Sequence, residues 1–317
     1  MTVLRLRGAV ARVAKLLATL FVVSVAAFGL LEITPGDPID SLAPPNATEE
    51  ARAQIAAANG LDRPIIERYG SWLGDAVQGD LGRSLQTQAK VWDEISSRLP
   101  VTLELAALSI LVGLLVAVPV ALYSGYRPGG LVDRVSGSLV SLTMSTPNFL
   151  LGILLVYVFA YTLGAFPALG YKPLSDGPAQ HYSRLVLPVI TLAAAQAVMF
   201  IRVLRNDVVT TLKQDYILSA KARGISTPKI LVKHALRPSA FSLLTVFGLA
   251  LGQLIGGTVI VESLFSIPGL GTLVINAITN RDVMMVQGIV LVVAVSYVVI
   301  NAVVDLMYPL LDPRIRR

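Results

Sequence analysis

Few residues in this sequence could take part in catalysis. The 317-residue chain has no cysteine, which excludes disulfides, thiol catalysis and cysteine-ligated metals. Its two histidines, His181 and His234, are far apart and fall in expected loops. The sequence has neither a Gly-x-x-x-x-Gly-Lys-Ser/Thr phosphate loop nor the Gly-x-Ser-x-Gly motif of serine hydrolases. We therefore expect no catalytic residue, metal or cofactor on this chain, and an intramembrane enzyme is disfavoured.

Isolated polar residues within long apolar segments form a second group of candidates. A polar side chain is costly in hydrocarbon and usually faces the interior of a helix bundle. The candidates for lining or gating an interior path are Pro147, Asn148, Gln196, Gln253 and Asn301, and Glu104 and Asp305 are further polar positions. Thr146-Pro147-Asn148 is the best site for a helix break, because proline lacks the helical donor. An interhelical hydrogen bond is the alternative role for each polar residue.

Composition places most of the chain in a membrane. Hydrophobic residues make up 54% of the sequence and charged residues only 15%, against about 25% charged in soluble domains. A helix needs about 20 mostly apolar residues to cross the hydrocarbon core. Six segments qualify, at roughly 13–31, 102–124, 136–164, 185–204, 240–261 and 285–310. The expected fold class is an all-α integral membrane protein with six transmembrane helices.

Basic residues set the expected orientation of these helices. If the N-terminus is cytoplasmic, the inner segments hold most of the lysines and arginines, above all the loop after the fourth span. The net charge of +6 is then a topology signal, and nucleic-acid binding is disfavoured. The first span has a basic start like a signal sequence, but no Ala-x-Ala-like site directly follows it. We expect a retained span and cytoplasmic N- and C-termini.

The segment 32–100 is polar enough to leave the membrane on the outer side, and its acidic residues outnumber its basic ones. It opens with the turn sequence Thr34-Pro35-Gly36-Asp37-Pro38. Helices are expected from Asn46 as N-cap to Asn59-Gly60, from Pro64 onward, and over about 90–99. A helical cap on the membrane domain and a docking platform for an external partner both fit this pattern.

The loop 205–238, on the expected inner side, carries the most specific local pattern. Residues 207–223 favour a helix, and Gly224 suits the left-handed position that ends one. Thr227 can cap a second, short helix with Pro228 at its first position. That helix would carry Ile230, Leu231, His234 and Ala235 on one side. Such a helix can insert into a groove on another protein, and resting on anionic lipid is the alternative.

Several motifs resemble those of one family of membrane proteins. Ala220-x-x-x-Gly224 is similar to the Glu-Ala-Ala…Gly signature of ABC importer permeases, although Leu218 and Ser219 stand where Glu and Ala would be. The motifs that agree with the dipeptide/oligopeptide subgroup are Thr34–Pro38, Gly79–Leu85, Arg98–Glu104, Val261–Gly271, Arg281-Asp282, Gln287-Gly288 and Leu311–Arg316. This ordered series covers nearly all of the chain, which is therefore identified as a member of that subgroup.

The resemblance implies a type I ABC importer permease that passes di- or oligopeptides across the bacterial cytoplasmic membrane. In that family the inner loop forms the coupling helix, which sits in a cleft on the ATP-hydrolysing subunit. This implies coupling roles for Asp215, Ala220, Ala222, Arg223, Gly224, Ile225, Pro228 and His234. The implied partners are a second homologous permease, two ATPase subunits or one fused double ATPase that hold ATP and Mg, and an extracytoplasmic peptide-binding protein.

The segment after the fifth span is expected to leave the membrane in a turn, because Ser266 to Gly271 cannot be helix interior. Residues 273–278 are expected to form a short helix. The resemblance implies that an outer mouth of the path includes Glu262, Phe265, Pro268, Gly269 and Gly271, and a rigid connector is the alternative. The Pro- and Gly-rich loop 165–184 is expected to be irregular, as a plain connector or as a contact for an external protein.

The expected organisation is an N-terminal segment with the first span (1–31), the extracytoplasmic segment (32–100), a five-helix permease core (101–311) and a cytoplasmic tail (312–317). Related permeases imply nickel complexes, glutathione or oligosaccharides as other substrates. An ion-coupled secondary transporter is disfavoured, because the sequence shows no clear internal repeat and the spans are almost free of charge.

Overall fold

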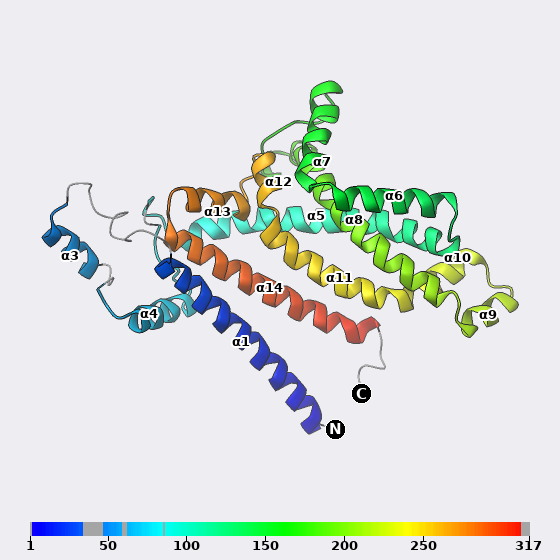
Figure 1. The fold of residues 1–317 in the computed structure, drawn as a ribbon, viewed down its shortest axis with the longest axis horizontal. Helices are drawn as coiled ribbons and strands as arrows, with labels where there is room; N and C mark the ends of the chain where they lie inside the picture. The colour runs from blue at the N-terminus through cyan, green and yellow to red at the C-terminus, as the bar shows by residue number, and fades with distance from the viewer. Residues whose placement is uncertain (1, 34–46, 59–61, 85, 312–317) are drawn as a thin grey trace. The chain divides into compact units, whose positions relative to one another are not determined.

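The computed structural model describes residues 2–33, 47–58, 62–84 and 86–311. In this part of the chain the elements are helical, apart from one isolated antiparallel bridge between Arg83 and Lys90. Their order is α1 (Thr2–Ile33), α3 (Glu49–Ala58), α4 (Ile65–Val77), α5 (Val91–Tyr126), α6 (Leu131–Ser145), α7 (Asn148–Leu155), the π-helix η1 (Val156–Thr162), the short 3-10 turn η2 (Leu174–Asp176), α8 (Pro178–Thr211), α9 (Asp215–Ala222), α10 (Thr227–Lys229), the π-helix η3 (Ile230–Ala235), α11 (Leu236–Gly257), α12 (Val259–Leu264), α13 (Leu270–Thr279) and α14 (Val283–Leu311) (Figure 1).

Several of these helices can cross a membrane. Among the described residues, four runs are long and apolar enough: Val91–Tyr126, Pro178–Thr211, Thr227–Gly257 and Val283–Met307. The pair α6 and α7 passes the same test together, which brings the number to as many as five. Shorter apolar helices cover Ala14–Gly29 and Leu270–Thr279. An all-helical membrane fold is thus confirmed, and the count of six spans stays a prediction.

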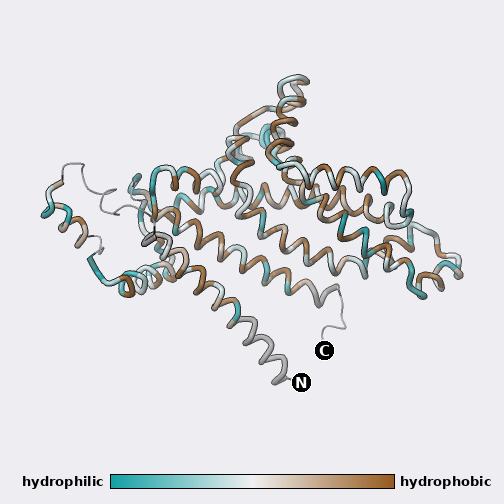
Figure 2. Tube along the Cα trace, viewed as in Figure 1, coloured by the Kyte–Doolittle hydropathy of each residue, from teal (hydrophilic) through white to brown (hydrophobic). Residues whose placement is uncertain are grey.

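The chain forms two compact units. The first contains residues 1–100 and 272–298, and the second contains 101–271 and 299–317. In the second unit α8 packs against α11, α6 and α7 (Figure 1). Its core holds Leu105, Phe200, Leu204, Ala250 and Phe265, all at most 2% exposed. Figure 2 shows apolar residues along most of α8 and α11, with hydrophilic residues gathered toward α9.

In the first unit, three of the motif segments meet. The Ser84 hydroxyl donates to the carboxylate of Asp282, and that carboxylate also accepts the N–H of Met285, 3.2 Å away, at the start of α14. A Cβ on Gly288 would lie 2.4 Å from Val91 Cγ1, so glycine lets α14 approach α5 closely. The segments Gly79–Ser84, Arg281-Asp282 and Gln287-Gly288 therefore have a shared structural role.

The predicted division between a helix over 90–99 and a span over 102–124 is wrong. α5 runs without interruption through Pro100. An interior proline costs a helix about 3 kcal/mol or more. Ile95 and Leu105, both 0% exposed on either side of it, offset that cost by burial.

The third predicted span, 136–164, is not one helix. α6 ends at Ser145 and α7 begins at Asn148, with a bend of 105° between them. Thr146 is extended (φ −114°, ψ 128°), the conformation favoured before a proline. The predicted site of the helix break is therefore confirmed.

Other boundaries differ by smaller amounts. Pro64 is the N-cap of α4 rather than its first residue. The fifth span was predicted at 240–261, whereas the helical run begins at Thr227 and α11 ends at Gly257. The predicted short helix over 273–278 is confirmed within α13. The features predicted at Thr34–Pro38, Asn46 and Asn59-Gly60, and in the tail 312–317, lie outside the described residues.

Candidate functional site

The loop between α8 and α11 ends its first helix in a Schellman turn. Gly224 has φ +74°, its N–H donates to the carbonyl oxygen of Lys221 (2.9 Å), and the N–H of Ile225 donates to that of Ala220 (3.2 Å). These are the two bonds that define the motif. The spacing Ala220-x-x-x-Gly224 is thereby explained, because the first residue supplies the carbonyl and the last supplies the left-handed backbone.

A small apolar cluster holds this loop together. Ile217 (0% exposed), Ala220 (1%) and Ile230 (2%) are buried, with Leu212 and Ile225 packed against them. The predicted helix over 207–223 is interrupted at residues 212–214, where Gln214 is extended and α9 starts afresh. This break turns α9 so that Ile217 and Ala220 face the cluster.

The opposite face of α9 is open. Leu218 is 56% exposed and Tyr216 46%, and Asp215, Ala222 and Arg223 are exposed as well. Partial burial raises the pKa of Tyr216 above its ordinary value, so the phenol stays neutral at physiological pH.

The second helix of the loop is not separate. Ser226, not Thr227, is its N-cap, and α10 passes through the π-helix η3 directly into α11. The predicted apolar side faces this chain rather than a partner, since Ile230 and Ala235 are buried and Leu231 and His234 are half-buried. Pro228 is exposed. His234 lies in η3 and His181 lies in α8. The predicted placement of both histidines in loops is therefore wrong.

The five predicted path residues differ in their burial. Pro147, Asn148 and Gln253 are exposed, and Asn301 is half-buried. Gln196 is 8% exposed, and its Cβ lies 3.4 Å from the place where a Cβ on Gly113 would be. Gln196 therefore lies where α8 meets α5, and the path role of all five residues stays a prediction.

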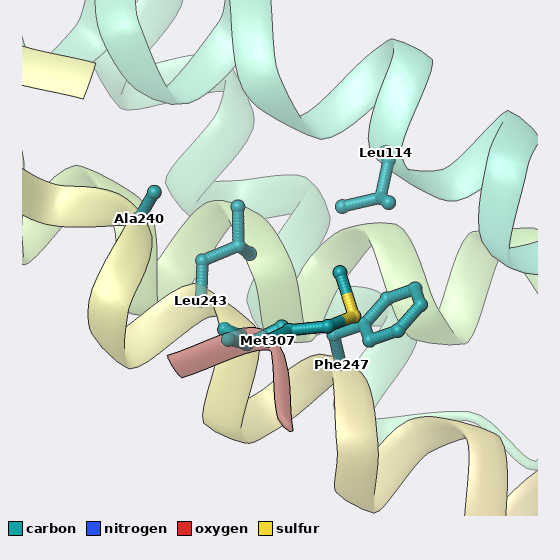
Figure 3. Close-up of a pocket in the computed structure, with 6 residues that line it drawn as sticks. Leu114, Ala240, Leu243, Phe247 and Met307 are labelled. Carbon is teal, nitrogen blue, oxygen red and sulfur yellow. The ribbon is translucent and has the colours of Figure 1, made fainter. Parts of the chain in front are cut away.

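Two cavities lie in the second unit, and neither is lined by those five residues. One of about 220 Å³ is lined only by apolar residues, namely Leu114, Ala240, Leu243, Leu244, Phe247 and Met307 (Figure 3). It has no group that could orient a peptide. The other, of about 500 Å³ between α6 and α8, is lined by polar and apolar residues that include Ser136, Arg202 and Asn206. Arg205 and Asp133 also line it, and they form a bidentate pair at 2.6 and 2.8 Å.

The predicted outer-mouth residues form a turn built around a buried carboxylate. Glu262 is 0% exposed, and its Oε1 accepts hydrogen bonds from the hydroxyls of Thr102 (2.8 Å) and Thr258 (2.7 Å). A Cβ on Gly269 would lie 2.4 Å from that carboxylate, and one on Gly271 would lie 2.8 Å from it and 2.5 Å from Val259 Cα. Glycine at both positions is therefore a packing requirement.

Of the remaining outer-mouth residues, one is buried and one is exposed. Phe265 is 2% exposed, and its carbonyl oxygen accepts the N–H of Gly170 from the outer loop (2.8 Å). Pro268 is exposed. Glu262 and Phe265 thus act as internal supports, and Pro268 is the residue of this group that meets the surroundings.

Sequence reasoning missed the pairing of the buried His181 with the half-buried Glu104. The His181 ring is 1% exposed, with Nε2 2.8 Å from Glu104 Oε1 and Nδ1 2.6 Å from the carbonyl oxygen of Lys172. Tyr171 meets the ring edge-on, and burial, with the nearby charge of Glu104, raises the pKa of its phenol. The pair ties the loop 165–177 to α5 and α8. The separation of 77 positions left no local signal for it.

Comparison with known proteins decides the family. Residues 109–317 match the profile of the binding-protein-dependent transport system inner membrane component, and residues 5–106 match the N-terminal profile of the same membrane components. The chain belongs to this family. It is thus an ABC transporter permease, a multi-pass component of the inner membrane.

Relatives of this permease agree along almost their whole length. A probable peptide ABC transporter permease of Sinorhizobium fredii is 35% identical over 96% of this chain and 97% of its own. A putative peptide transport system permease of Brucella abortus is 37% identical with the same coverage. The glutathione transport system permease GsiC of Escherichia coli is 35% identical, again with the same coverage. These matches confirm the resemblance seen in the motifs.

A solved structure supports the fold. A chain of the methionine ABC transporter MetNI, in an inward-facing conformation, superposes with a TM-score of 0.56. The alignment covers 69% of this permease and 96% of that chain, at 17% identity. At that identity the likeness concerns the fold alone.

Proposed function

We propose that this permease passes di- or oligopeptides from an extracytoplasmic binding protein across the cytoplasmic membrane, driven by ATP hydrolysis on partner subunits. The observation that carries the proposal is the near full-length similarity to relatives named as peptide permeases, at 35–37% identity. Glutathione is itself a short peptide, so the relative named for it falls within the same chemical class.

The proposed topology has six spans. α1 is the first, α5 the second, the bent pair α6 and α7 with η1 the third, and α8, α11 and α14 the others. The excess of basic residues around α9 and at the N-terminus supports cytoplasmic placement of both. The segment before α5 then lies outside the cell membrane, where a binding protein can reach it.

The proposed assembly contains a second homologous permease, two ATPase subunits or one fused double ATPase, and the binding protein. ATP and Mg bind the ATPase subunits, and this chain is non-catalytic. The exposed face of α9, with Leu218 at its centre, contacts the ATPase. Coupling roles for Asp215, Ala222 and Arg223 are supported by their exposure on the same loop.

The loop is suited to transmit movement to the membrane. On one side it continues α8 after a turn of three residues, and on the other it runs through α10 and η3 into α11 as one helical stretch, Thr227–Gly257. The Schellman turn and the cluster around Ile217 hold the two arms together. A displacement of α9 is therefore passed to α11, which packs along α8.

The test is reconstitution of the complete transporter in vesicles, with ATP hydrolysis measured with and without peptide and binding protein. The proposal expects peptide-loaded binding protein to raise the ATPase rate severalfold. A rate that ignores every peptide but responds to another solute would replace the substrate class. Failure of this chain to associate with any ATPase would contradict the coupling role.

A further inference from the structure

Helix α4 (Ile65–Val77) has two apolar strips and one polar face. At 100° per residue, Ile65, Tyr69, Trp72 and Ala76 form one strip, and Ile66, Gly70, Leu73 and Val77 form the adjacent one. Glu67, Ser71, Asp75 and Gln78 lie opposite and are exposed. The helix therefore buries less apolar surface within the chain than its sequence offers.

The first strip packs on α1. Tyr69 lies edge-on to Phe21 and Phe28, with ring centroids 6.4 and 5.5 Å apart, and Trp72 lies 5.8 Å from Phe28. The hydroxyls of Tyr69 and Ser24 are 2.8 Å apart and hydrogen-bonded. This aromatic group fixes which side of α4 faces α1.

Most of the second strip is open in this chain: Ile66, Gly70 and Val77 are exposed, and Leu73 is half-buried. Ile66 is 84% exposed and Val77 is 81% exposed. Two such side chains on one strip of a single short helix would be unfavourable in water. Covering this strip with an apolar surface or lipid would remove that area from water and is therefore favourable.

The depth of α4 identifies what covers it. Its contacts on α1, from Phe21 to Phe28, lie inside the apolar run Ala14–Gly29, not beyond the end of that run. α1 continues to Ile33, so Phe28 lies about 8 Å before its end, at about 1.5 Å of rise per residue. A helix that packs on this part of a span lies at the depth of the bilayer. Tyr and Trp are also the residues that favour the boundary between lipid and water.

We infer that α4 is an interfacial helix embedded in the outer leaflet, with the Ile66–Val77 strip in contact with lipid acyl chains and the Glu67–Asp75 face toward water. It lies along the membrane surface, as amphipathic anchors do. This rests on the proposed assignment of α1 as the first span. It also adds a membrane contact to a segment otherwise expected to serve as a soluble cap or platform.

The absence of cysteine in the sequence makes a direct test possible. Four single-cysteine variants are each labelled with a fluorophore in the reconstituted transporter, whose partner subunits have no reactive cysteine. Ile66→Cys and Val77→Cys lie on the open strip, and Ser71→Cys and Asp75→Cys lie on the polar face. Quenching is then measured with nitroxide-bearing phospholipids and with aqueous iodide, in the absence of binding protein. Val22→Cys, at a residue of α1 that is 64% exposed, reports whether α1 itself meets lipid.

The inference predicts that labels at 66 and 77 are quenched severalfold more by the nitroxide lipids than labels at 71 and 75, with the reverse order for iodide. Equal access of iodide to all four positions would overturn it. Protection of 66 and 77 from both quenchers would also overturn it, because a protein partner would then cover the strip. If the label at 22 also fails to meet lipid, the proposed topology fails, whereas failure at 66 and 77 alone refutes only the interfacial helix.

Discussion

Ile225 donates its backbone N–H to the carbonyl oxygen of Ala220, and this 3.2 Å hydrogen bond closes the turn that links α9 to α10. Gly224, between them, has φ +74° and makes the second bond of the motif. The turn fixes the direction in which the chain leaves α9 and enters the helical run from α10 to α11. Coupling through this loop requires that the turn be rigid.

Replacement of Gly224 tests that rigidity through the backbone alone. No atom lies within 4 Å of a Cβ added there, so a side chain meets strain but no clash. Asparagine tolerates the left-handed region, whereas a β-branched residue loses roughly 1–2 kcal/mol. We expect Gly224→Asn to keep most of the peptide-stimulated ATPase activity of the assembled transporter and Gly224→Val to lose most of it. Equal activity of the two variants would show that the turn has no role in coupling.

The outer turn offers a test by compensation. Gly269→Ala brings a Cβ within 2.4 Å of the Glu262 carboxylate, and the three nearest atoms all belong to Glu262. We expect a loss of about 1–3 kcal/mol in stability, measured as a lower melting temperature of the purified transporter. Glu262→Ala should restore part of this loss in the double variant.

Gly271→Ala is the matched control for that compensation. Its nearest obstacle is the backbone atom Val259 Cα, 2.5 Å away, which Glu262→Ala leaves in place. The second substitution should therefore not restore stability in the Gly271→Ala background. Restoration in both backgrounds, or in neither, would contradict the packing described for this turn.

The sequence predicted the fold class and the helix break at Pro147 because hydropathy and proline act locally. It also predicted the left-handed Gly224. It failed where packing overrides local preference: Pro100 lies inside α5 because Ile95 and Leu105 are buried around it. The His181–Glu104 pair could not be predicted, since the two residues meet only after α5 and α8 pack.

The His181–Glu104 pair gives a further prediction. The His181 ring is only 1% exposed; its Nδ1 donates to the Lys172 carbonyl oxygen, and its Nε2 pairs with the Glu104 carboxyl group. Glu104→Ala leaves a buried polar nitrogen without that partner, which costs about 1–3 kcal/mol. We expect a lower melting temperature and faster amide hydrogen exchange in the loop 165–177. Tyr182→Phe keeps the edge-on ring contact at 4.9 Å and should change neither quantity. An unchanged Glu104→Ala variant would show that the pair does not hold the loop.

The most direct test of the account concerns Leu218, which is 56% exposed on α9, next to Ile217, which is 0% exposed. The stimulation of ATP hydrolysis by peptide-loaded binding protein is measured in vesicles for Leu218→Asp and for the apolar control Leu218→Met, with assembly of the permease pair checked in both. The account predicts that Leu218→Met keeps the stimulation and that Leu218→Asp loses at least about tenfold, as expected if more than about 1.4 kcal/mol of contact energy is lost. Equal stimulation in the two variants would contradict contact between this face of α9 and the ATPase, and with it the proposed route of coupling.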